Sequence, residues 1–424
     1  MSISLLFKKK RIFEVVFISA LLFAGIITFF ILSKSHGVNQ QRIFFTDPAN
    51  YFMDFYNHIK FSAMRDPYKN TNFPSSEKAY PPINYLILYP FSKLFDYNTQ
   101  VPGAARSTQF GIMSVVIFLV FSSILLAYLI NDAKNGPKII RFLTVLAFFT
   151  SGIFLFSLER ANVIFLAVVC AAFFIMFYKS NNKILREISL IALAVAFSLK
   201  IYPAIFGLLL LYEKQYKDIL RLIIYAVLIF FLPFLFLHNG LLNIGLLIRN
   251  AKLQTDAYLF DGAFYRFGLI PVGIYFGLPK PQLYAALYLG FALFVLAIAQ
   301  SFSMKKTWKR VLLLSCAMVL TPPWSAFYCG LYLFIPIVLF LNEEEHALSD
   351  WIYLILILLV LNPFQINNGN IPISSLISNI SLIVLYLFLC IESLTSTIKF
   401  SISYFGNIRL KKTFSSEKVL DQIV

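Results

Sequence analysis

KKKRIFEVVFISALLFAGIITFFIL, residues 8–32, places a basic cluster directly before an apolar run long enough to cross a membrane. The apolar run, residues 12–32, is longer than the core of about 7–15 residues in a signal peptide, and no small-x-small cleavage site follows it. We therefore predict a retained first membrane span. Because cytoplasmic loops collect Lys and Arg, the N-terminus is expected in the cytoplasm.

The composition indicates a membrane protein that is surrounded largely by lipid. Hydrophobic residues make up 59% of the 424 positions and charged residues 13%, whereas a typical soluble domain has about 25% charged residues. The net charge of +16 would suggest nucleic acid in a soluble protein, but basic cytoplasmic loops explain it here. We expect membrane lipids as partners and no nucleic acid. The four cysteines lie in apolar runs without CxxC spacing and predict neither disulfides nor a zinc site.

Basic clusters along the chain predict the side on which each loop lies. They alternate with apolar runs and give about twelve spans, with both termini cytoplasmic and two long outer segments, about 33–106 and about 238–282. The stretch 82–95 is short, and we expect it to dip into the membrane or lie on it; 203–212 is the weakest predicted span. The predicted fold is an all-α polytopic membrane protein, one domain over residues 1–424, with juxtamembrane or re-entrant helices in both outer loops.

The charged residues on the predicted outer side are not explained by membrane insertion. Holding charged groups at a membrane boundary is costly, so such residues are candidates for function. They are Asp47, Asp54, His58, Arg65, Asp66, Glu159, Arg160, Lys200, His238, Arg249, Asp256, Asp261 and Arg266. The sequence therefore predicts a site at the outer ends of the helices.

The first outer segment contains a predicted amphipathic helix. Asp47 followed by Pro48 is typical of a helix start, and the helix would run to about Met64. Asp47 and Asp54 would lie on one face about 10 Å apart, with His58 one turn further. A plain N-cap would also explain Asp47. Aspartate is unfavourable inside a helix, so Asp54 is the less easily explained carboxylate.

Two further groups of polar residues lie at predicted outer turns, each between the end of one helix and the start of the next. Glu159, Arg160 and Asn162 form the first group, and Lys200 opens the second, Lys200-Ile201-Tyr202-Pro203. A lysine at an outer helix end opposes the positive-inside bias and would suit a lipid phosphate or a carboxylate. Snorkelling to the headgroups is the alternative.

The second outer segment adds basic residues of its own. Arg249, Lys252 and Arg266 lie within it and form a further candidate anion site. Beyond it, Thr321-Pro322-Pro323-Trp324 marks a broken helix boundary on the same predicted side.

In this order, the motifs resemble the polyprenyl-phosphate-sugar-dependent glycosyltransferases of the GT-C superfold, and most of all glycosyltransferase family 87. Lys200-Ile201-Tyr202-Pro203 matches the Lys-x-Tyr-Pro element well, and Arg160-Ala161-Asn162 replaces Gly-Gln-x-Asn. Phe327 and Tyr328 occupy the region where the family usually has a His. The other matching elements are the Asp of the first outer loop, Asp66-Pro67-Tyr68, Tyr80-Pro81-Pro82 and Thr321-Pro322-Pro323-Trp324.

The resemblance implies transfer of one sugar, a hexose such as mannose or a pentose, to a glycan or lipid hydroxyl at the outer face of a bacterial inner membrane, with inversion. The donor would be a lipid-linked sugar such as polyprenyl-phosphate-mannose, and neither a cofactor nor a metal is expected. The implied general base is Asp47, which fits the family's spacing to Pro-Tyr better, or Asp54, which with Phe55 fits the family's local Asp-Phe pairing, and both stay open. Lys200, helped by Arg160 or Arg266, would bind the donor phosphate. The implied substrate contacts are His58, Tyr80, Glu159, Asn162, Tyr202 and Trp324.

The alternatives are a secondary transporter, a lipid flippase, and a polymerase or ligase of lipid-linked glycans. Transporters also use broken helices and membrane-embedded charges, but place them near the middle of the bilayer. Here the unexplained charges lie at one predicted face, which favours an enzyme.

Overall fold

The structure is a computed structural model that describes residues 11–35, 51–69, 78–97, 99–260, 265–323, 325–368 and 371–395. Two of the predicted site residues, Asp47 and Trp324, lie outside these residues. The described chain is almost wholly helical, which confirms the all-α prediction. All four cysteines are free thiols.

The elements follow one another along the chain in this order. The first half contains α1 (Ile12–Ser35), α2 (Met53–Ala63), α3 (Pro82–Leu88), η4 (Tyr89–Lys93), η5 (Pro102–Ser107), α4 (Gln109–Ala133), α5 (Lys138–Phe149), α6 (Gly152–Arg160), α7 (Ile164–Phe177), α8 (Lys183–Leu199), η6 (Tyr202–Gly207) and α9 (Leu208–Tyr212). The second half contains α10 (Tyr216–Phe231), η7 (Leu232–Phe236), η8 (Gly240–Leu242), α11 (Asn243–Tyr258), β1 (Arg266–Phe267), α12 (Leu269–Tyr275), α13 (Lys280–Ser301), α14 (Thr307–Leu320), β2 (Ser325–Ala326), η10 (Phe327–Leu333), α15 (Phe334–Leu341), α16 (Asp350–Leu361), β3 (Asn367–Asn368), β4 (Ile371–Pro372) and the helix Ile373–Thr395.

Among the described residues, five helices are long and apolar enough to cross a membrane, which suggests a membrane protein. They are Ile12–Ile31, Gln109–Ala133, Tyr216–Phe236, Lys280–Ser301 and Ile373–Thr395. The prediction of about twelve spans is not confirmed, because several predicted spans form shorter apolar helices. These are Ile164–Phe177, Tyr202–Tyr212, Phe327–Leu341 and Asp350–Leu361.

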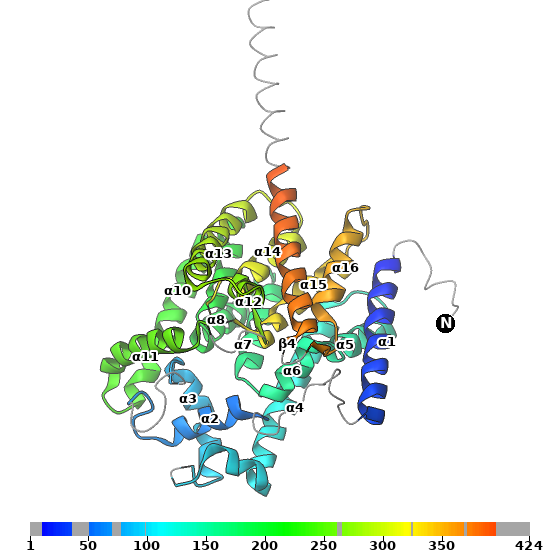
Figure 1. Ribbon diagram of the computed structural model, residues 1–424. Coiled ribbons are helices and arrows are strands. Elements are labelled where there is room, and N and C mark those ends of the chain that lie inside the picture. The colour runs from blue at the N-terminus through cyan, green and yellow to red at the C-terminus, as the bar shows by residue number, and fades with distance from the viewer. Residues whose placement is uncertain are drawn as a thin grey trace, which may run out of the picture.

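The helices α2, α3 and α11 of the two predicted outer segments lie toward one end of the bundle. Figure 1 shows α2 and α3 at the lower end, where α1 finishes, and α11 running across the direction of α1. The start of α1 and the end of the helix Ile373–Thr395 lie at the opposite, upper end. The stretch 82–95 is short and helical, in α3 and η4, as predicted for a segment that does not cross.

A bend in the chain brings the α6 end toward α2. The helices α5 and α6 meet at 61°. Thr150 closes α5, and its hydroxyl donates to the carbonyl of Ala147 at 3.0 Å and to that of Leu21 in α1 at 3.3 Å. Ser151 then caps α6, because its hydroxyl accepts from the amide of Phe154. Two adjacent hydroxyl residues therefore end one helix and start the next.

The core is arranged around α14. Every residue of α14 from Val311 to Val319 is buried, as expected for a helix that is apolar on all sides and surrounded by other helices. Trp308 at its start packs against Phe340 of α15 and Tyr353 of α16. By contrast, α13 exposes large apolar side chains such as Tyr288 and Phe291, which suits a lipid-facing helix.

A buried ion pair joins α1 to the end of α4. Lys134 Nζ lies 2.6 Å from Glu14, and the two side chains are 2% and 5% exposed. Lys134 also donates to the side-chain oxygen of Asn342 at 3.0 Å, while the Asn342 amide donates to the carbonyl of Ala133 at 2.7 Å. Removing one member of such a pair leaves an uncompensated charge in a dry environment.

We predict that Lys134→Met lowers the free energy of unfolding by up to about 3–5 kcal/mol, because the buried Glu14 loses its close partner and keeps only Arg11, at 4.0 Å. The double variant Glu14→Gln/Lys134→Met is expected to recover most of this loss. Lys306→Met, which breaks the exposed pair with Glu343, serves as the matched control and should cost less than about 1 kcal/mol. Denaturant unfolding of the purified protein measures all three. An equal effect at Lys134 and Lys306 would contradict the assignment.

Candidate active site

The helix α2 carries two of the predicted site residues. It begins at Met53, preceded by Phe52 in the left-handed conformation (φ 58°), whereas the predicted helix start at Asp47 lies outside the described residues. The Phe52 amide donates to the Glu159 carbonyl at 2.7 Å, which ties the start of α2 to the end of α6. As a result, Asp54 in the first turn of α2 faces the residues that follow α6.

Asp54 is held by two residues from the end of α6. Arg160 forms an ion pair with one carboxylate oxygen, and the Asn162 amide donates to the other at 2.9 Å. Asp54 and Arg160 are 15% and 24% exposed, so the pair is neither fully solvated nor sealed from the surface. Burial raises the pKa of Asp54, but the charge and hydrogen bond of Arg160 and the hydrogen bond of Asn162 outweigh it and hold this pKa below its ordinary value. Asp54 is therefore an ionised carboxylate at neutral pH.

Asn162 is the buried centre of the cluster. Besides Asp54, its side-chain nitrogen lies 3.2 Å from the Tyr80 hydroxyl and 3.3 Å from the Tyr328 hydroxyl. Its side-chain oxygen accepts from the amide of Ile164 at 3.0 Å, which fixes the amide orientation. Ala161, directly before it, is fully buried with a φ of 49°, an unusual conformation for a residue with a Cβ. The turn that aims Asn162 at Asp54 thus has a strained backbone.

Lys200 reaches the same cluster from the end of α8. Its Nζ lies 3.9 Å from the centre of the Tyr80 ring and 6.0 Å from that of the Tyr328 ring, the geometry of a cation–π contact. Asn84 in α3 helps to position it, because the Asn84 amide donates to the Leu199 carbonyl at 3.1 Å. Within the part of the chain that the structure describes, the Lys200 ammonium forms no ion pair and no hydrogen bond, although the backbone amide bonds to the Ala196 carbonyl. Its charge is therefore available to an anion.

His58 lies one turn along α2 from Asp54 and is 4% exposed. Its ring packs against Tyr80 at a centroid distance of 3.9 Å. Among the described residues, no group hydrogen-bonds its Nδ1 atom. Burial lowers the pKa of His58 to about 3, although the nearby Asp54 carboxylate acts in the opposite direction, so the ring is neutral at pH 7.

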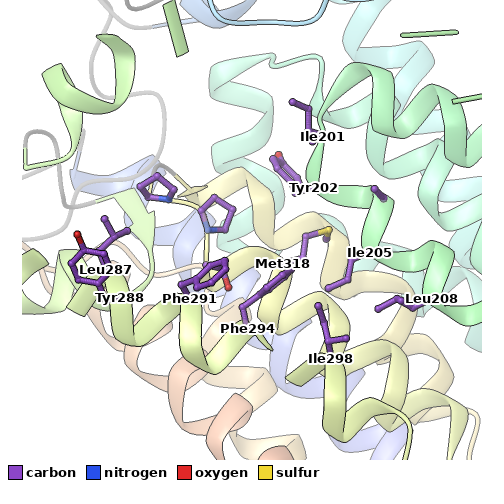
Figure 2. A pocket seen from close by; sticks show the side chains of 14 residues that line it. Ile201, Tyr202, Ile205, Leu208, Leu287, Tyr288, Phe291, Phe294, Ile298 and Met318 are labelled. Atoms are coloured by element: carbon purple, nitrogen blue, oxygen red, sulfur yellow. The ribbon is translucent and has the colours of Figure 1, made fainter. Parts of the chain in front are cut away.

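An apolar cavity begins directly after Lys200. It has a volume of about 730 Å³, and Figure 2 shows Ile201 and Tyr202 at its wall with Phe291 and Phe294 of α13 across from them. Its remaining lining residues are Ala204, Ile205, Leu208, Leu287, Tyr288, Ile298, Met318, Thr321, Pro322 and Pro323. The Tyr202 hydroxyl lies 3.5 Å from the Cys329 sulfur. A long apolar group is the ligand type that such a lining favours.

The structure brings most of the predicted site residues together. Side chains of Asp54, Arg160, Asn162, Tyr80, His58 and Lys200 form one connected cluster, and Tyr202 lies next to it in the cavity wall. Glu159 contributes its backbone carbonyl to α2. Arg266 is buried elsewhere, where its guanidinium donates to the backbone carbonyls of Leu259 and Pro323, and burial lowers its pKa to about 10.

Two residues of the cluster were not predicted as site residues. Tyr328 appeared in the sequence analysis only as an occupant of a region where the family has a His. Asn84 lies inside the apolar stretch 82–95 and carries no signal beyond being an amide among apolar neighbours. A buried amide needs hydrogen-bond partners, and that requirement is the one physical hint that could have singled out Asn84.

Comparison with known proteins finds one family model that matches the middle of the chain. Residues 79–245 match the family model of glycosyltransferase family 87. The match confirms the resemblance and indicates a membrane glycosyltransferase. It spans less than half of the chain and includes Tyr80, Arg160, Asn162 and Lys200, whereas Asp54 and Tyr328 lie outside it. No curated protein and no solved structure matched the chain.

The buried neutral histidine predicts a pH dependence of stability. The pKa of His58 is about 3 in the folded protein and near 6.5 when unfolded, so the unfolded state binds more protons between these values and stability falls as the pH drops. From pH 7 to pH 5 this contributes a loss of about 2 kcal/mol. We predict that His58→Gln removes this contribution. Denaturant unfolding at both pH values measures it, with the exposed His238→Gln as control. An unchanged pH dependence in His58→Gln would contradict the neutral assignment.

Proposed function

We propose that the protein transfers one sugar from a polyprenyl-phosphate donor to the hydroxyl of a glycan or lipid acceptor, with inversion at the anomeric carbon. The observation that carries the proposal is the arrangement around Tyr80. Its hydroxyl accepts from Asn162, which also holds the ionised Asp54, while its ring lies under the Lys200 ammonium. A base and an anion-binding cation thus lie on the two sides of one aromatic residue.

Lys200 and the adjoining cavity fit the two parts of such a donor. A lysine ammonium binds phosphate as a compact charge, and this one has no competing carboxylate among the described residues. The next two residues, Ile201 and Tyr202, already line the apolar cavity. A phosphate at Lys200 would therefore place an attached prenyl chain at the cavity opening, where burial of apolar surface stabilises binding.

Asp54 has the properties of a general base for the acceptor. A carboxylate oxygen has two lone pairs, so Asp54 can accept a further hydrogen bond while Arg160 and Asn162 remain bound. The acceptor oxygen would attack the anomeric carbon as its proton passes to Asp54. The bond from that carbon to the phosphate oxygen breaks, and Lys200 stabilises the negative charge that develops on the phosphate. One direct displacement inverts the anomeric configuration.

The sugar, the acceptor and the membrane are parts of the proposal. We propose a hexose such as mannose, or a pentose, transferred at the non-cytoplasmic face of a bacterial cell membrane. Support for the side comes from the basic clusters of the sequence together with Figure 1, in which α2 and the two ends of the described chain lie at opposite ends of the bundle. Arg266 would act indirectly, because its guanidinium supports the Pro323 carbonyl at the cavity wall.

Asp54→Asn is predicted to lower sugar transfer by at least about 100-fold, since general-base catalysis commonly contributes 10²–10⁴. Asp66→Asn, which removes a carboxylate bonded to Asn239 outside the cluster, is the matched control and should retain activity. The assay follows radiolabelled sugar passing from purified polyprenyl-phosphate mannose, glucose or a pentose to membrane acceptors. Full activity of Asp54→Asn with a donor that the wild type uses would disprove its role as base.

Lys200→Gln is predicted to weaken the binding of polyprenyl phosphate itself by at least about tenfold, because one charge-assisted phosphate contact is lost. Lys93→Gln, on an exposed lysine over the Tyr89 ring, is the control with the same charge change. Titration of the purified protein with polyprenyl phosphate measures the dissociation constant without any transfer. Equal affinities of Lys200→Gln and wild type would show that Lys200 does not bind the donor phosphate.

A further inference from the structure

The helix α11 starts close to the point at which a membrane-spanning helix ends. The span Tyr216–Phe236 finishes at η7, and α11 begins seven positions later at Asn243. One face of α11 is buried, through Asn243, Leu247 and Asn250. Figure 1 shows α11 crossing the direction of α1, so its axis lies across the spans. Because α11 follows a candidate membrane span after only seven positions, it must lie near the end of that span.

Large apolar side chains are exposed around the start of α11. They are Leu235 (60% exposed), Phe236 (77%), Leu241 (50%), Leu242 (81%) and Ile248 (66%). Exposing this many large apolar residues in water is unfavourable, whereas the boundary between headgroups and acyl chains suits them. The apolar residues therefore favour a lipid neighbour for this corner of the molecule.

Four cations lie on the same corner. Arg249 and Lys252 are exposed on α11 on either side of Asn250, while Arg65 and Lys69 are exposed on the segment after α2. The Asn250 amide joins the two segments, because it donates to the Tyr68 carbonyl at 3.1 Å. Across the described ranges, none of these four side chains forms an ion pair or a hydrogen bond through its charged group. We call these four residues the basic corner.

We propose that the basic corner, together with the exposed apolar residues of α11, binds the headgroups of anionic phospholipids on the candidate-site side of the membrane. Cations beside exposed apolar side chains are typical of helices that lie in an anionic membrane surface. A phosphate-rich glycan would also suit the charges, but it would leave Leu242 and Ile248 unexplained. The proposal does not depend on sugar transfer.

The surface is connected to the candidate active site by one residue. The Tyr68 carbonyl accepts from Asn250, and the Tyr68 hydroxyl donates to the Tyr80 carbonyl at 2.7 Å. Tyr80 in turn contacts Lys200 and Asn162. Bound headgroups would thus hold α11 at the membrane surface. This would also fix the depth of Lys200 relative to the lipid phosphates.

The test measures lipid binding to the purified full-length protein in neutral detergent. Native mass spectrometry follows titration with dioctanoyl phosphatidylglycerol or dioctanoyl phosphatidylcholine. The wild type is expected to prefer phosphatidylglycerol, and Arg249→Gln/Lys252→Gln should weaken that binding about tenfold or more, since each cation contributes roughly fivefold. Arg249→Lys, which keeps the charge, should bind like the wild type.

Two controls make the result decisive. Lys214→Gln/Lys217→Gln removes two exposed cations before and at the start of α10, at the other end of that helix from η7. An equal loss there would mean general attraction and overturn the proposal. Leu242→Ser/Ile248→Ser should weaken phosphatidylglycerol binding without changing charge. If it has no effect and soluble polyglycerol phosphate binds more tightly, the partner is a soluble polyanion and the lipid proposal is wrong.

Discussion

The ion pair between Asp54 and Arg160 is the contact on which the rest of the candidate site depends. It joins α2, in the first predicted outer segment, to the helix bundle, and the Phe52–Glu159 backbone hydrogen bond reinforces it. Taking either charge out of water is costly, and for Asp54 the Arg160 guanidinium together with the Asn162 hydrogen bond offsets that cost. The same pairing keeps Asp54 ionised and orients it toward Asn162. One interaction therefore positions the helix and sets the charge of the proposed base.

The residues of the cluster come from separate segments of the chain, and each segment contributes a different chemical group. The strained turn at Ala161 presents Asn162, the end of α8 presents Lys200, and Tyr80 separates the two. Asn162 in turn is held by the start of α7, where its side-chain oxygen accepts from the Ile164 amide, which lacks a partner within the helix. Sites built from helix ends at one membrane boundary can bind a lipid headgroup while the lipid tail stays among apolar helices.

The sequence predicted much of this arrangement, and physical reasons explain the remainder. Hydropathy and basic clusters predicted the all-α membrane fold, and the family match confirmed the resemblance. The contact between Asp54 and Arg160 bridges 106 positions, and no local pattern encodes such a pairing. Tyr328 lies in an apolar run, where a tyrosine is indistinguishable from core. For Arg266, the anion-binding role stays a prediction, and the structure adds that its guanidinium donates to the backbone carbonyls of Leu259 and Pro323, which composition cannot reveal. The number of spans stays a prediction because short apolar runs fit both spanning and buried helices.

The central claim is that Lys200 and the apolar cavity bind a polyprenyl phosphate beside Asp54. A structure determined by electron cryomicroscopy with bound polyprenyl phosphate tests it most directly. The account predicts a phosphate oxygen within about 3 Å of the Lys200 ammonium, with the prenyl chain between Tyr202 and Phe291. A phosphate bound away from Lys200, or a prenyl chain that leaves this cavity empty, would contradict it.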